Sequence, residues 1–564
     1  MDDRWHKALY GSPEGWEIAS IDAPDVSEDS SDGIRFGTGG IRCLMGAGPN
    51  RMNRLTVGRA AQGVANWLKK RACGSELLVA IGHDTRVHSE EFATLVACVL
   101  AANDVRALLL RGAQPTPVLD YAVREHGCDA GVVITASHNP REYNGLKVYD
   151  SAGVQATDGM AAAIQSEIER VDPFESVRQI GYDEALASGA VTFSGERLLT
   201  EYREHVLEQR LGVDCSGLRV VYSPLNGTGL PYVTHVLSAL NTRWSIVESQ
   251  AQEDGTFPNC PKPNPENLRA MRPGMELLRN ESADLFLATD PDADRVGVAC
   301  MDNGSPRLLT GDEVGLLLLD FMCRYRVEAG AVPVAVTTIV SSPLADTIAD
   351  GNSCELRRTL TGFKYVGEQI GEIESSGKEF LVGFEESDGY LRGGYVRDKD
   401  GINAAMLACE LAAYYKSMGM TLADALEELY RRYGYVTGRQ LTFPFPAEDG
   451  CRAMTTLMGA LRERGPAALG RLAVVGVVDY LHGARMPVVG GTTQSRLPQA
   501  DVLEWRLEGG SRVLVRPSGT EPKLKCYVFA MGVSQDDACR TLSDLCDGVT
   551  SVIQSFGFSG GDES

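Results

Sequence analysis

The sequence contains no long apolar run and little positive charge. Its longest apolar stretches, such as VGLLLLDFM at residues 314–322, fall far short of the roughly 20 residues that span a bilayer. Lys and Arg total 54 against 76 Asp and Glu, which gives a formal net charge of −22. This balance argues against nucleic acid or an anionic membrane as a general partner. An anionic small ligand would need a local basic pocket.

The 14 cysteines show no metal-binding or redox spacing, because they are scattered singly and no CxxC pair occurs. We expect them to be mostly free thiols in a reducing compartment. The opening segment, MDDRWHKALYGSPEGW, lacks the basic and then apolar stretch of a signal peptide. These features predict a cytoplasmic protein with no membrane segment, and nothing in the sequence indicates an obligatory protein partner.

The chain of 564 residues is too long for one hydrophobic core, and a usual domain length of about 150 residues suggests about three to five domains. Short β-rich segments alternate with segments of helical period through most of the chain. Such a succession begins at residues 75–104, begins again at 217–240 and begins a third time at 332–350. This alternation is typical of βαβ units on a largely parallel sheet. After residues 440–450 the predicted order of elements changes to one helix, several strands and a final helix.

The sequence therefore predicts an α/β protein of four domains, three of them similar and with mixed sheets, and the last a C-terminal α+β domain. We place these domains at residues 1–212, 213–328, 329–440 and 441–564. In open α/β sheets, ligands bind beyond the carboxyl ends of the strands. The polar loops that follow the predicted strands are therefore the candidate functional sites.

The loop TASHNP, at residues 135–140, brings Ser137 and His138 to the carboxyl end of the apolar strand AGVVI. It lacks the flanking glycines of a G-x-S-x-G elbow, which disfavours a serine hydrolase. Taken alone, Ser137 is better explained as a turn or capping hydroxyl than as a catalytic group. The remaining polar loops decide between these interpretations.

The loop ATDPDADRVG places Asp290, Asp292 and Asp294 at alternate positions after another apolar strand. Three carboxylates so close would repel one another unless they held a cation, and hard oxygen ligands suit Mg²⁺. An EF-hand is excluded because Arg295 and Met301 stand where that loop requires Gly and Glu. A D-x-D-x-T nucleophile is disfavoured because an aspartate takes the place of the threonine. A solvated acidic turn stays open as the alternative.

Three further loops combine groups that suit a sugar phosphate. GFEESDGYLRGGYVRDKDG (383–401) offers carboxylates and hydroxyls for sugar hydroxyls, and basic groups for a phosphate. VRPSGTEPKLK (515–525) offers a guanidinium, two hydroxyls and backbone N–H groups that could cradle a phosphate dianion. RFGTGGIR (35–42) is another glycine-rich candidate. For each loop in isolation, a mixed-charge surface segment or a plain glycine turn is the alternative.

Taken in order, the five stretches resemble those of the α-D-phosphohexomutase family, the phosphoglucomutases and phosphomannomutases. TASHNP resembles the serine loop of that family, DPDADR its metal loop, FEESDGY its sugar loop and RPSGTEP its phosphate loop. The resemblance covers the chain from about residue 35 to the end of the last domain. FGTGGIR, NGLKVY, TLTGFKYVG and RDKDG together look most like the long phosphoglucomutase and phosphopentomutase branch. The fold of the family, four domains around a central cleft, agrees with the predicted architecture.

The resemblance implies an isomerase of carbohydrate metabolism that works as an intramolecular phosphotransferase. Ser137 would carry the phosphoryl group, with Mg²⁺ held by its phosphate oxygen and by Asp290, Asp292 and Asp294. A sugar 1-phosphate held by the phosphate loop would receive this group at its 6-hydroxyl, with glucose 1,6-bisphosphate as intermediate and activator. The residues implied to bind substrate are Arg295, Thr361, Gly362, Glu385, Ser387, Arg397, Arg516, Ser518, Gly519 and Thr520.

Four basic residues have implied roles around the phosphoryl group. Arg42 and Arg295 match family arginines that face the phosphoryl site, and Arg86 in GHDTR would support that site from behind. We expect His138 to orient the phosphoserine loop rather than to transfer a proton. These are the roles to compare with the geometry.

The proton acceptor is the least defined part of the implied site. Phe384 stands where the family usually has Gly. Some members of the family place a His just after the serine as a candidate base, but here Asp388 follows Ser387. Lys399 in RDKDG matches a lysine proposed for proton transfer in glucose-type members, and Lys147 in NGLKVY is a second candidate. A lysine base must lose its proton near pH 7, so its pKa would have to be depressed by burial or by neighbouring cations.

The sugar loop favours glucose phosphates as substrates. Its EES sequence resembles the glucose-type loop more than the mannose-type loop, which has Met between Glu and Ser. Phosphomannomutase or phosphopentomutase activity is the alternative on the same scaffold, since small differences in a pocket decide such discrimination. A non-catalytic relative that binds sugar phosphates is a more remote alternative. The expected ligand is in every case a small sugar phosphate.

Overall fold

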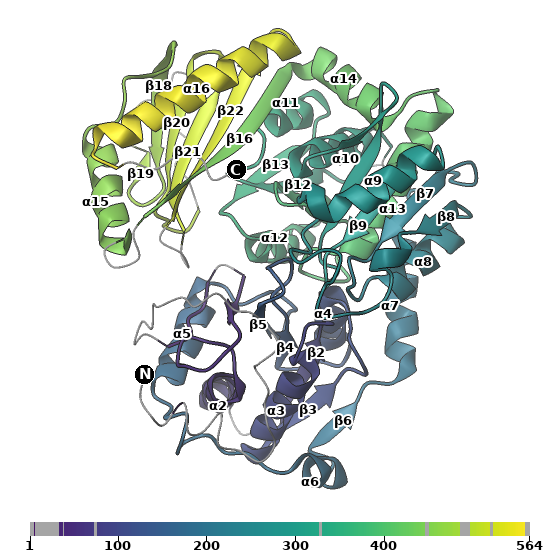
Figure 1. Cartoon of the computed structure of the whole chain (residues 1–564), viewed down its shortest axis with the longest axis vertical. Coiled ribbons are helices and arrows are strands. Elements are labelled where there is room, and N and C mark those ends of the chain that lie inside the picture. Colours follow the sequence, from purple (N-terminus) through teal and green to yellow (C-terminus); the bar gives the residue numbers. More distant parts are fainter. Residues whose placement is uncertain are drawn as a thin grey trace. The chain divides into compact units, whose positions relative to one another are not determined.

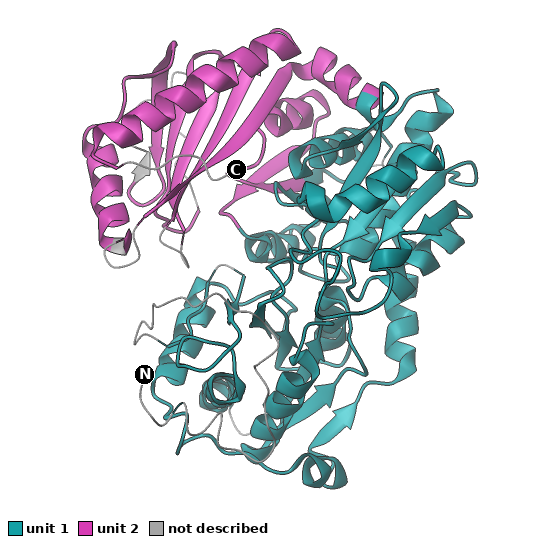
Figure 2. Ribbon diagram, in the orientation of Figure 1, with its two compact units in different colours: residues 1–334, 362–423 teal, residues 335–361, 424–564 magenta. Residues whose placement is uncertain are grey.

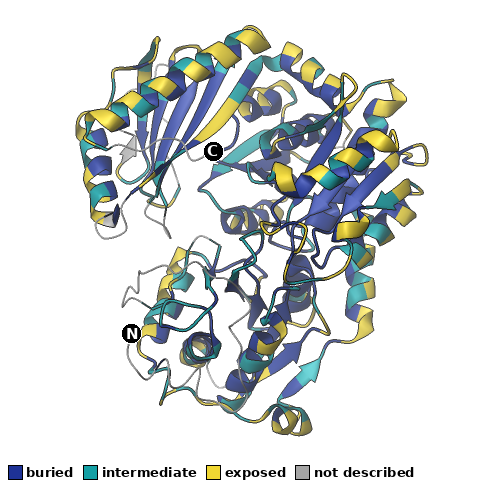
Figure 3. Ribbon diagram, viewed as in Figure 1, coloured by how far each residue is buried: buried dark blue, intermediate teal, exposed yellow. Residues whose placement is uncertain are grey.

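The computed structural model describes residue 5 and residues 33–37, 39–72, 76–325, 330–445, 450–484, 497–518 and 523–558. The chain forms two compact units, residues 1–334 with 362–423 and residues 335–361 with 424–564 (Figure 2). In both units the strands are mostly buried, and exposed residues lie mainly on the outer faces of helices (Figure 3).

The first sheet has six strands, most of which are labelled in Figure 1, and the predicted serine loop follows one of them. Its strand order is β1 (Ile41–Leu44), β5 (Tyr143–Asp150), β4 (Ala130–Ile134), β2 (Leu77–His83), β3 (Val105–Leu109) and β6 (Val191–Phe193). The helices of this region are α2 (Arg54–Arg71), α3 (Ser89–Ala102), α4 (Thr116–Glu125), α5 (Asp158–Glu169), α6 (Tyr182–Ala187) and α7 (Glu196–Glu208). β2 runs parallel to β3 and β4, and β5 runs antiparallel to β4 and β1, so the sheet is mixed.

The second sheet has five strands and carries the predicted metal loop between two of them. Its order is β11 (Ser305–Leu308), β10 (Val296–Asp302), β9 (Leu285–Thr289), β7 (Arg219–Ser223) and β8 (Arg243–Ile246). Helices α8 (Leu230–Ala239) and α9 (Leu268–Asn280) and the short 3₁₀ helix η2 (Glu248–Gln250) belong to this region. β7 is parallel to β8 and β9, whereas β9 and β10 form an antiparallel pair whose turn is the metal loop.

The third sheet has four strands, in the order β13 (Glu355–Thr359), β12 (Pro333–Thr338), β14 (Glu379–Glu385) and β15 (Gly389–Leu391). The helices here are α10 (Gly311–Tyr325), α11 (Leu344–Gly351), α12 (Phe363–Ser375), α13 (Gly401–Ser417) and α14 (Leu422–Tyr433). α13 is buried around almost its whole circumference, which explains its apolar sequence. Asp400 caps it by accepting the backbone N–H groups of Ile402 and Asn403, and this fixes the RDKDG segment at the start of the helix.

The C-terminal part of the second unit is a sheet covered by two helices. The strand order is β16 (Tyr435–Pro444), β22 (Lys523–Gly532), β21 (Arg512–Pro517), β20 (Leu503–Leu507), β18 (Leu472–Asp479) and β17 (Ala468–Leu469), and β19 (Gly483–Ala484) also pairs with β18. The adjacent pairs are antiparallel. Helices α15 (Gly450–Glu463) and α16 (Gln535–Ser555) contribute to one core with these strands, and η3 (Glu508–Gly510) is a short turn.

These sheets agree with the predicted fold class, since two mixed α/β sheets and a third α/β sheet are followed by an antiparallel sheet with two long helices. The four domain bounds, with borders after residues 212, 328 and 440, stay a prediction. Within the described ranges, no helix combines the length and the apolar content that crossing a bilayer requires.

Candidate active site

The serine loop begins where the buried strand β4 ends. Every residue of β4 is buried, and so is Ser137 three residues after it. Ser137 has a φ of +51°, in the left-handed region that a residue with a Cβ rarely occupies. Backbone strain of this kind persists only where the surroundings hold it, and it is concentrated at functional sites. The question is therefore what holds Ser137.

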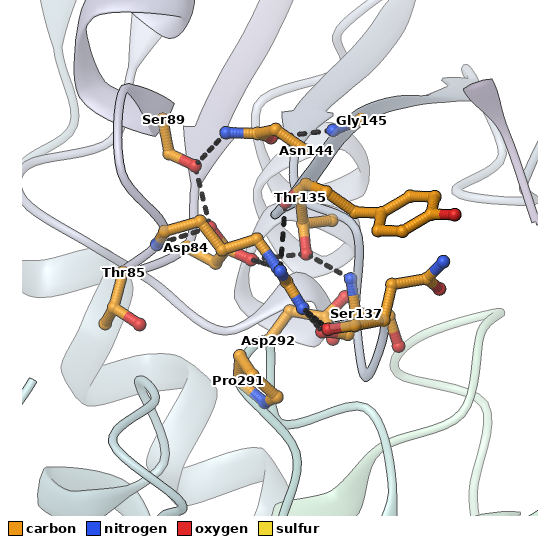
Figure 4. Close-up of polar contacts among 12 residues, drawn as sticks. Asp84, Thr85, Ser89, Thr135, Ser137, Asn144, Gly145, Pro291 and Asp292 are labelled. Atoms are coloured by element: carbon orange, nitrogen blue, oxygen red, sulfur yellow. Dashed lines mark hydrogen bonds and ion pairs between the residues drawn. The ribbon is translucent and has the colours of Figure 1, made fainter. Parts of the chain in front are cut away.

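A relay of side chains fixes the backbone N–H of Ser137 (Figure 4). This N–H donates to Oγ1 of Thr135 over 2.8 Å, and the Thr135 hydroxyl donates in turn to Oδ2 of Asp84 over 2.6 Å. Oδ1 of Asp84 accepts from the Ser89 hydroxyl over 2.8 Å, and Ser89 accepts from Asn144. The relay ties the serine loop to the ends of β2 and α3.

The guanidinium of Arg86 holds the carbonyl side of the same loop. Its Nη2 donates to the carbonyl oxygens of Ser137 and Asn139, each over 2.5 Å, and its Nη1 donates to those of Pro140 and Tyr143. Arg86 is buried and pairs with Asp84. Arg86 therefore supports the serine loop through its carbonyl groups.

Asp290, Asp292 and Asp294 lie in the turn between β9 and β10, and all three are fully buried. One carboxylate oxygen of each lies within 4.8 Å of the others. The hydroxyl of Ser137 donates to Oδ2 of Asp290 over 2.7 Å. The serine loop and the metal loop, 153 residues apart in sequence, thus meet in one site.

Four donors hold the outer oxygens of this cluster. Nζ of Lys147 lies 2.7 Å from Oδ2 of Asp292 and 2.8 Å from Oδ2 of Asp294, and Nζ of Lys399 lies 3.1 Å from the same oxygen of Asp294. The hydroxyl of Thr116 donates to Oδ2 of Asp292 over 2.7 Å. The fourth donor is the backbone N–H of Arg295, which donates to Oδ1 of Asp290 over 3.1 Å.

Oδ1 of Asp292 and Oδ1 of Asp294 are buried and have no hydrogen-bond partner among the described residues. A buried carboxylate oxygen without a partner is costly, and hard oxygen atoms are the ligands that Mg²⁺ and Ca²⁺ prefer. The three aspartates therefore fit a divalent cation, with their outer oxygens already engaged by Lys147, Lys399 and Thr116.

The charges of the three carboxyl groups are not equivalent. Burial and the neighbouring Asp292 and Asp294 raise the pKa of Asp290 well above its ordinary value. Burial also tends to raise the pKa of Asp294, but Lys147, Lys399 and Arg295 outweigh it and the net pKa lies far below the ordinary value. The same balance with Lys147 and Thr116 lowers the pKa of Asp292. Added positive charge at the cluster would favour ionisation of all three.

Neither candidate lysine has the depressed pKa that a base needs. Burial lowers the pKa of Lys147, but Asp292 and Asp294 outweigh it and the net pKa is raised. Lys399 behaves in the same way, since Asp294, Asp398 and Glu385 raise its pKa far more than burial lowers it. As they are placed here, both side chains are ammonium ions.

Two arginines and a histidine add further nitrogen groups near the serine loop. Nη1 of Arg42 donates to Oδ1 of Asn139 over 2.9 Å, and Nη1 of Arg295 donates to the carbonyl oxygen of Ser387. Nδ1 of His138 lies 3.2 Å from Oγ of Ser137. Burial and the charges of Arg295 and Arg42 lower the pKa of His138 well below its usual value, so this imidazole is neutral at pH 7.

The sugar loop brings one carboxyl group close to these charges. Glu385, the last residue of β14, is buried, and burial raises its pKa to about 7 against the opposing effects of Lys399 and Arg295. Arg397 is engaged elsewhere, because Nη2 and Nη1 donate to the carboxylate of Glu374 over 2.6 and 3.2 Å. The predicted role of Arg397 in substrate binding thus stays a prediction.

Thr361 and Gly362 form the turn that leads into α12. Gly362 has a φ of +119°, which is why a glycine stands there, and it precedes the first residue of the helix. The buried hydroxyl of Thr361 has no hydrogen-bond partner in the described part of the chain.

In the second unit, the predicted phosphate loop joins β21 to β22. Arg516 lies near the end of β21, and Ser518 follows it, with its N–H donating to the carbonyl oxygen of Lys523 over 2.7 Å. Gly519 and Thr520 lie outside the described residues. The prediction that this loop follows a strand is correct.

Several residues that support the site were not predicted from the sequence. They are Asp84, Thr116, Thr135 and Tyr149. Thr116 offered a partial signal, since it follows the parallel strand β3 and polar residues after such strands are candidates. No local pattern separates it from an ordinary residue at the start of a helix.

The sequence matches four family models in succession. Residues 33–174, 200–304 and 310–433 match the phosphoglucomutase/phosphomannomutase alpha/beta/alpha domains I, II and III, and residues 464–539 match the C-terminal domain of the same family. The order of these models confirms the predicted fold class.

Relatives and solved structures agree with these matches. A phosphoglucomutase from Staphylococcus epidermidis is 33% identical over 518 residues, which cover 89% of this chain and 92% of the relative. One from Staphylococcus haemolyticus is 34% identical over 499 residues, covering 88% and 90%.

The crystal structure of pp63/parafusin, an exocytosis-sensitive phosphoprotein and phosphoglucomutase from Paramecium, has a TM-score of 0.70 at 17% identity and covers 94% of this chain and 96% of that one. The structure of a phosphoglucomutase/phosphomannomutase family protein from Burkholderia thailandensis has a TM-score of 0.66 at 18% identity. The match covers 93% of this chain and 98% of that one. Both structures share the fold. The motifs, the domain matches and the similarity to these relatives together show that the chain belongs to the phosphoglucomutase/phosphomannomutase family.

Proposed function

We propose that the protein interconverts α-D-glucose 1-phosphate and glucose 6-phosphate, with Ser137 as the phosphoryl carrier. The observation that carries this proposal is the 2.7 Å hydrogen bond from the Ser137 hydroxyl to Asp290, inside a buried cluster of three carboxylates. The relatives named phosphoglucomutase, about a third identical over most of the chain, support the same reaction.

Asp290, Asp292 and Asp294 would hold Mg²⁺, to which a phosphate oxygen on Ser137 would be a further ligand. When bound, this ion supplies positive charge that offsets the phosphoryl oxygens and reduces the pull of the aspartates on the lysine protons. Arg42 and Arg295 add guanidinium groups that suit a phosphoryl group. Arg86 and Thr135 hold the backbone of Ser137 while its side chain changes state.

The reaction requires two phosphoryl transfers, one from Ser137 to the sugar and one from the sugar back to Ser137. In the first, the bond between phosphorus and Oγ of Ser137 breaks as a bond to the sugar 6-hydroxyl oxygen forms, while that hydroxyl gives its proton to a base and Oγ takes up a proton. The product is glucose 1,6-bisphosphate. After this intermediate turns over, its 1-phosphoryl group moves to Oγ of Ser137, which loses its proton as the sugar O1 gains one, and this leaves glucose 6-phosphate and a phosphorylated enzyme.

Lys399 or Lys147 is the base that we infer for the sugar hydroxyl. Both lie at the carboxylate cluster, and both stay protonated while the aspartates alone surround them. His138 contacts Oγ of Ser137 and would orient the phosphoserine. We keep it out of proton transfer to the sugar, as the sequence suggested.

The substrate would be held at both ends. Glu385, Ser387, Thr361, Gly362 and Arg397 are proposed for the sugar side, and Arg516, Ser518, Gly519 and Thr520 for the phosphate that is not being transferred. A sugar phosphate is the only partner that we infer, with no nucleic acid, membrane or obligatory protein. A cytoplasmic location is proposed from the cysteine spacing.

Intact mass spectrometry tests the phosphoryl carrier. Protein purified without substrate is expected to show a fraction with one added phosphate, and Ser137→Ala is expected to lose both this fraction and all turnover. Ser238→Ala, a surface change on α8, is the matched control and should keep both. If no phosphate is found on Ser137 and glucose 1,6-bisphosphate does not start turnover, the proposal is wrong.

A panel of glucose, mannose and pentose phosphates tests the substrate. We expect the highest kcat/KM with glucose 1-phosphate, since both the EES sequence and the named relatives favour it. A higher value with mannose 1-phosphate or a pentose phosphate would replace glucose by that alternative. No conversion of any of them would favour a non-catalytic relative.

A further inference from the structure

Thr116 makes two hydrogen bonds to one residue of the metal loop. Its backbone N–H donates to the carbonyl oxygen of Asp292 over 2.8 Å, and its hydroxyl donates to Oδ2 of the same residue over 2.7 Å. Thr116 is fully buried and lies 176 residues before Asp292 in the chain. Both the backbone and the carboxylate of Asp292 are therefore held from α4.

The two oxygens of Asp292 have different surroundings. Oδ2 accepts from Thr116 and from Lys147, whereas Oδ1 is buried with no hydrogen-bond partner among the described residues. Asp294 has a similar division, since Oδ2 lies near Lys147 and Lys399, whereas Oδ1 accepts no hydrogen bond within the described ranges and lies 3.8 Å from Nε of Arg295. The donors thus engage one oxygen of each carboxylate and leave the other available.

Thr116 differs from the two lysines in charge and in stiffness. Its hydroxyl is neutral, so it orients a carboxylate without adding positive charge that would compete with a bound cation. Its χ1 is restricted by the branched Cβ, and Pro115 and Pro117 on either side restrict the backbone. A rigid, neutral donor suits the role of fixing a ligand in the orientation that a metal ion needs.

We propose that Thr116 is a positioning residue for the metal site, which fixes Asp292 so that Oδ1 is presented to the divalent cation. The proposal rests on the metal site of the proposed function, but it concerns affinity for the cation and not the reaction. Outer partners of this kind commonly change metal affinity by about 10- to 100-fold when removed.

Titration with Mn²⁺, followed by electron paramagnetic resonance on the unphosphorylated protein, tests this role. Thr116→Val removes the hydroxyl but keeps the branched Cβ and the backbone N–H, and we expect the Kd for Mn²⁺ to rise about 10- to 100-fold. Thr116→Ser restores the hydroxyl and should return the Kd to within about threefold of the natural protein. An unchanged Kd in Thr116→Val would overturn the proposal.

Two further measurements separate this role from a purely structural one. Without metal, Thr116→Val should unfold at a slightly lower midpoint than Thr116→Ser, because it lacks one buried hydrogen bond. A large loss of stability in Thr116→Val with an unchanged Mn²⁺ affinity would show that Thr116 only ties the segments together. If Thr116→Val does not fold, Thr116→Ala removes the same hydroxyl and carries the same expectation.

Failure of the proposed function would look different. A protein without phosphate on Ser137, whose Mn²⁺ affinity nevertheless falls in Thr116→Val, would contradict the mutase reaction and support the role of Thr116. An active mutase whose Mn²⁺ affinity does not respond to the loss of this hydroxyl would support the reaction and contradict the role.

Discussion

The serine loop and the metal loop meet at one hydrogen bond but are held in different ways. The serine loop is held through its backbone, because Arg86 donates to its carbonyl oxygens and Thr135 accepts a hydrogen bond from the N–H of Ser137. Most of the supporting groups come from one region of the chain, between residues 84 and 145, and Arg42 adds a hydrogen bond to the side chain of Asn139.

The metal loop is held from three separate segments of the chain. The carbonyl oxygens of Pro291, Asp292 and Ala293 accept from Thr228, Thr116 and Gly401, respectively. Its carboxylates are also held directly, by Lys147 and Lys399. In this loop the functional side chains themselves, and not only the backbone, are fixed by their neighbours.

The difference indicates what each loop needs for its chemistry. Ser137 must change between a hydroxyl and a phosphate ester, so its support acts on the backbone and leaves the side chain to Asp290 and His138. The aspartates keep one chemical state but concentrate negative charge in a buried place, so their support is a balance of charge. We expect changes around the metal loop to affect stability most, and changes around the serine loop to affect rate most.

The largest effect is expected from Lys147→Met, which tests the balance of charge. The variant leaves buried carboxylates without one of their cations, and breaking a buried ion pair in this way typically costs about 3–5 kcal/mol in the free energy of unfolding. Mg²⁺ should restore much of this loss, because a ligand that binds only the folded state stabilises it. Chemical denaturation with Mg²⁺ and with a chelator measures both quantities.

Lys70→Met is the matched control for this variant. Lys70 also forms an ion pair of 2.7 Å, with Glu167, but its side chain is 59% exposed. Exposed pairs contribute roughly 0–1 kcal/mol, so we expect a small loss of stability that does not depend on Mg²⁺. Equal losses in the two variants would contradict the difference between the loops.

Thr135→Val comes next and tests the support of the serine loop. Loss of its hydroxyl leaves the N–H of Ser137 buried without its acceptor, and a small displacement of Ser137 can lower a rate about 100-fold. We expect the rate at which glucose 1,6-bisphosphate phosphorylates Ser137 to fall by about 10- to 100-fold. Quenched-flow samples analysed by intact mass spectrometry measure this rate.

Thr135→Val and Thr116→Val form a complementary pair. Each exchanges one buried threonine hydroxyl for a methyl group, but only the second contacts a proposed metal ligand. We expect Thr135→Val to leave the Mn²⁺ affinity within about threefold, which is small beside the 10- to 100-fold effects of outer-shell changes. A weaker Mn²⁺ affinity in both variants would mean that the two loops are not supported independently.

The same contrast explains what the sequence could predict. Ser137 and the three aspartates stand directly after apolar strands, so their place at the carboxyl ends of β4 and β9 follows from local pattern. The family and the succession of four domains were also predicted and are confirmed by the domain matches. These features depend on residues that are neighbours in sequence.

The orientation of the carboxylates could not be predicted, because it depends on strand register and on distant segments. Lys147 reaches Asp292 because β5 pairs antiparallel with β4 and places Lys147 opposite Val133. A shift of one residue would turn Lys147 to the other face of the sheet. The guanidinium of Arg397, assigned to substrate from its motif, is bound to Glu374, a partner that no motif indicated.

The smallest effect is expected from Tyr149→Phe, which asks whether support of the site extends one residue further. Tyr149 lies two residues after Lys147 on the same face of β5, and its buried hydroxyl donates to Oδ2 of Asp398 over 2.9 Å. Asp398 in turn accepts from Nζ of Lys399 over 3.2 Å. Loss of one such hydrogen bond typically costs about 1 kcal/mol in the free energy of unfolding.

Tyr202→Phe is the matched control for this prediction. Tyr202 is equally buried, and its hydroxyl donates over 2.7 Å to Asp400. Asp400 caps α13 and does not hold Lys399. Both variants should lose similar stability. If Lys399 takes the sugar proton, only Tyr149→Phe should lower kcat, with an unchanged KM, because the lysine is displaced while the substrate is still bound. Equal kcat values in the two variants would limit the functional support to Lys147, Lys399 and Thr116, and would make Tyr149 a part of the core.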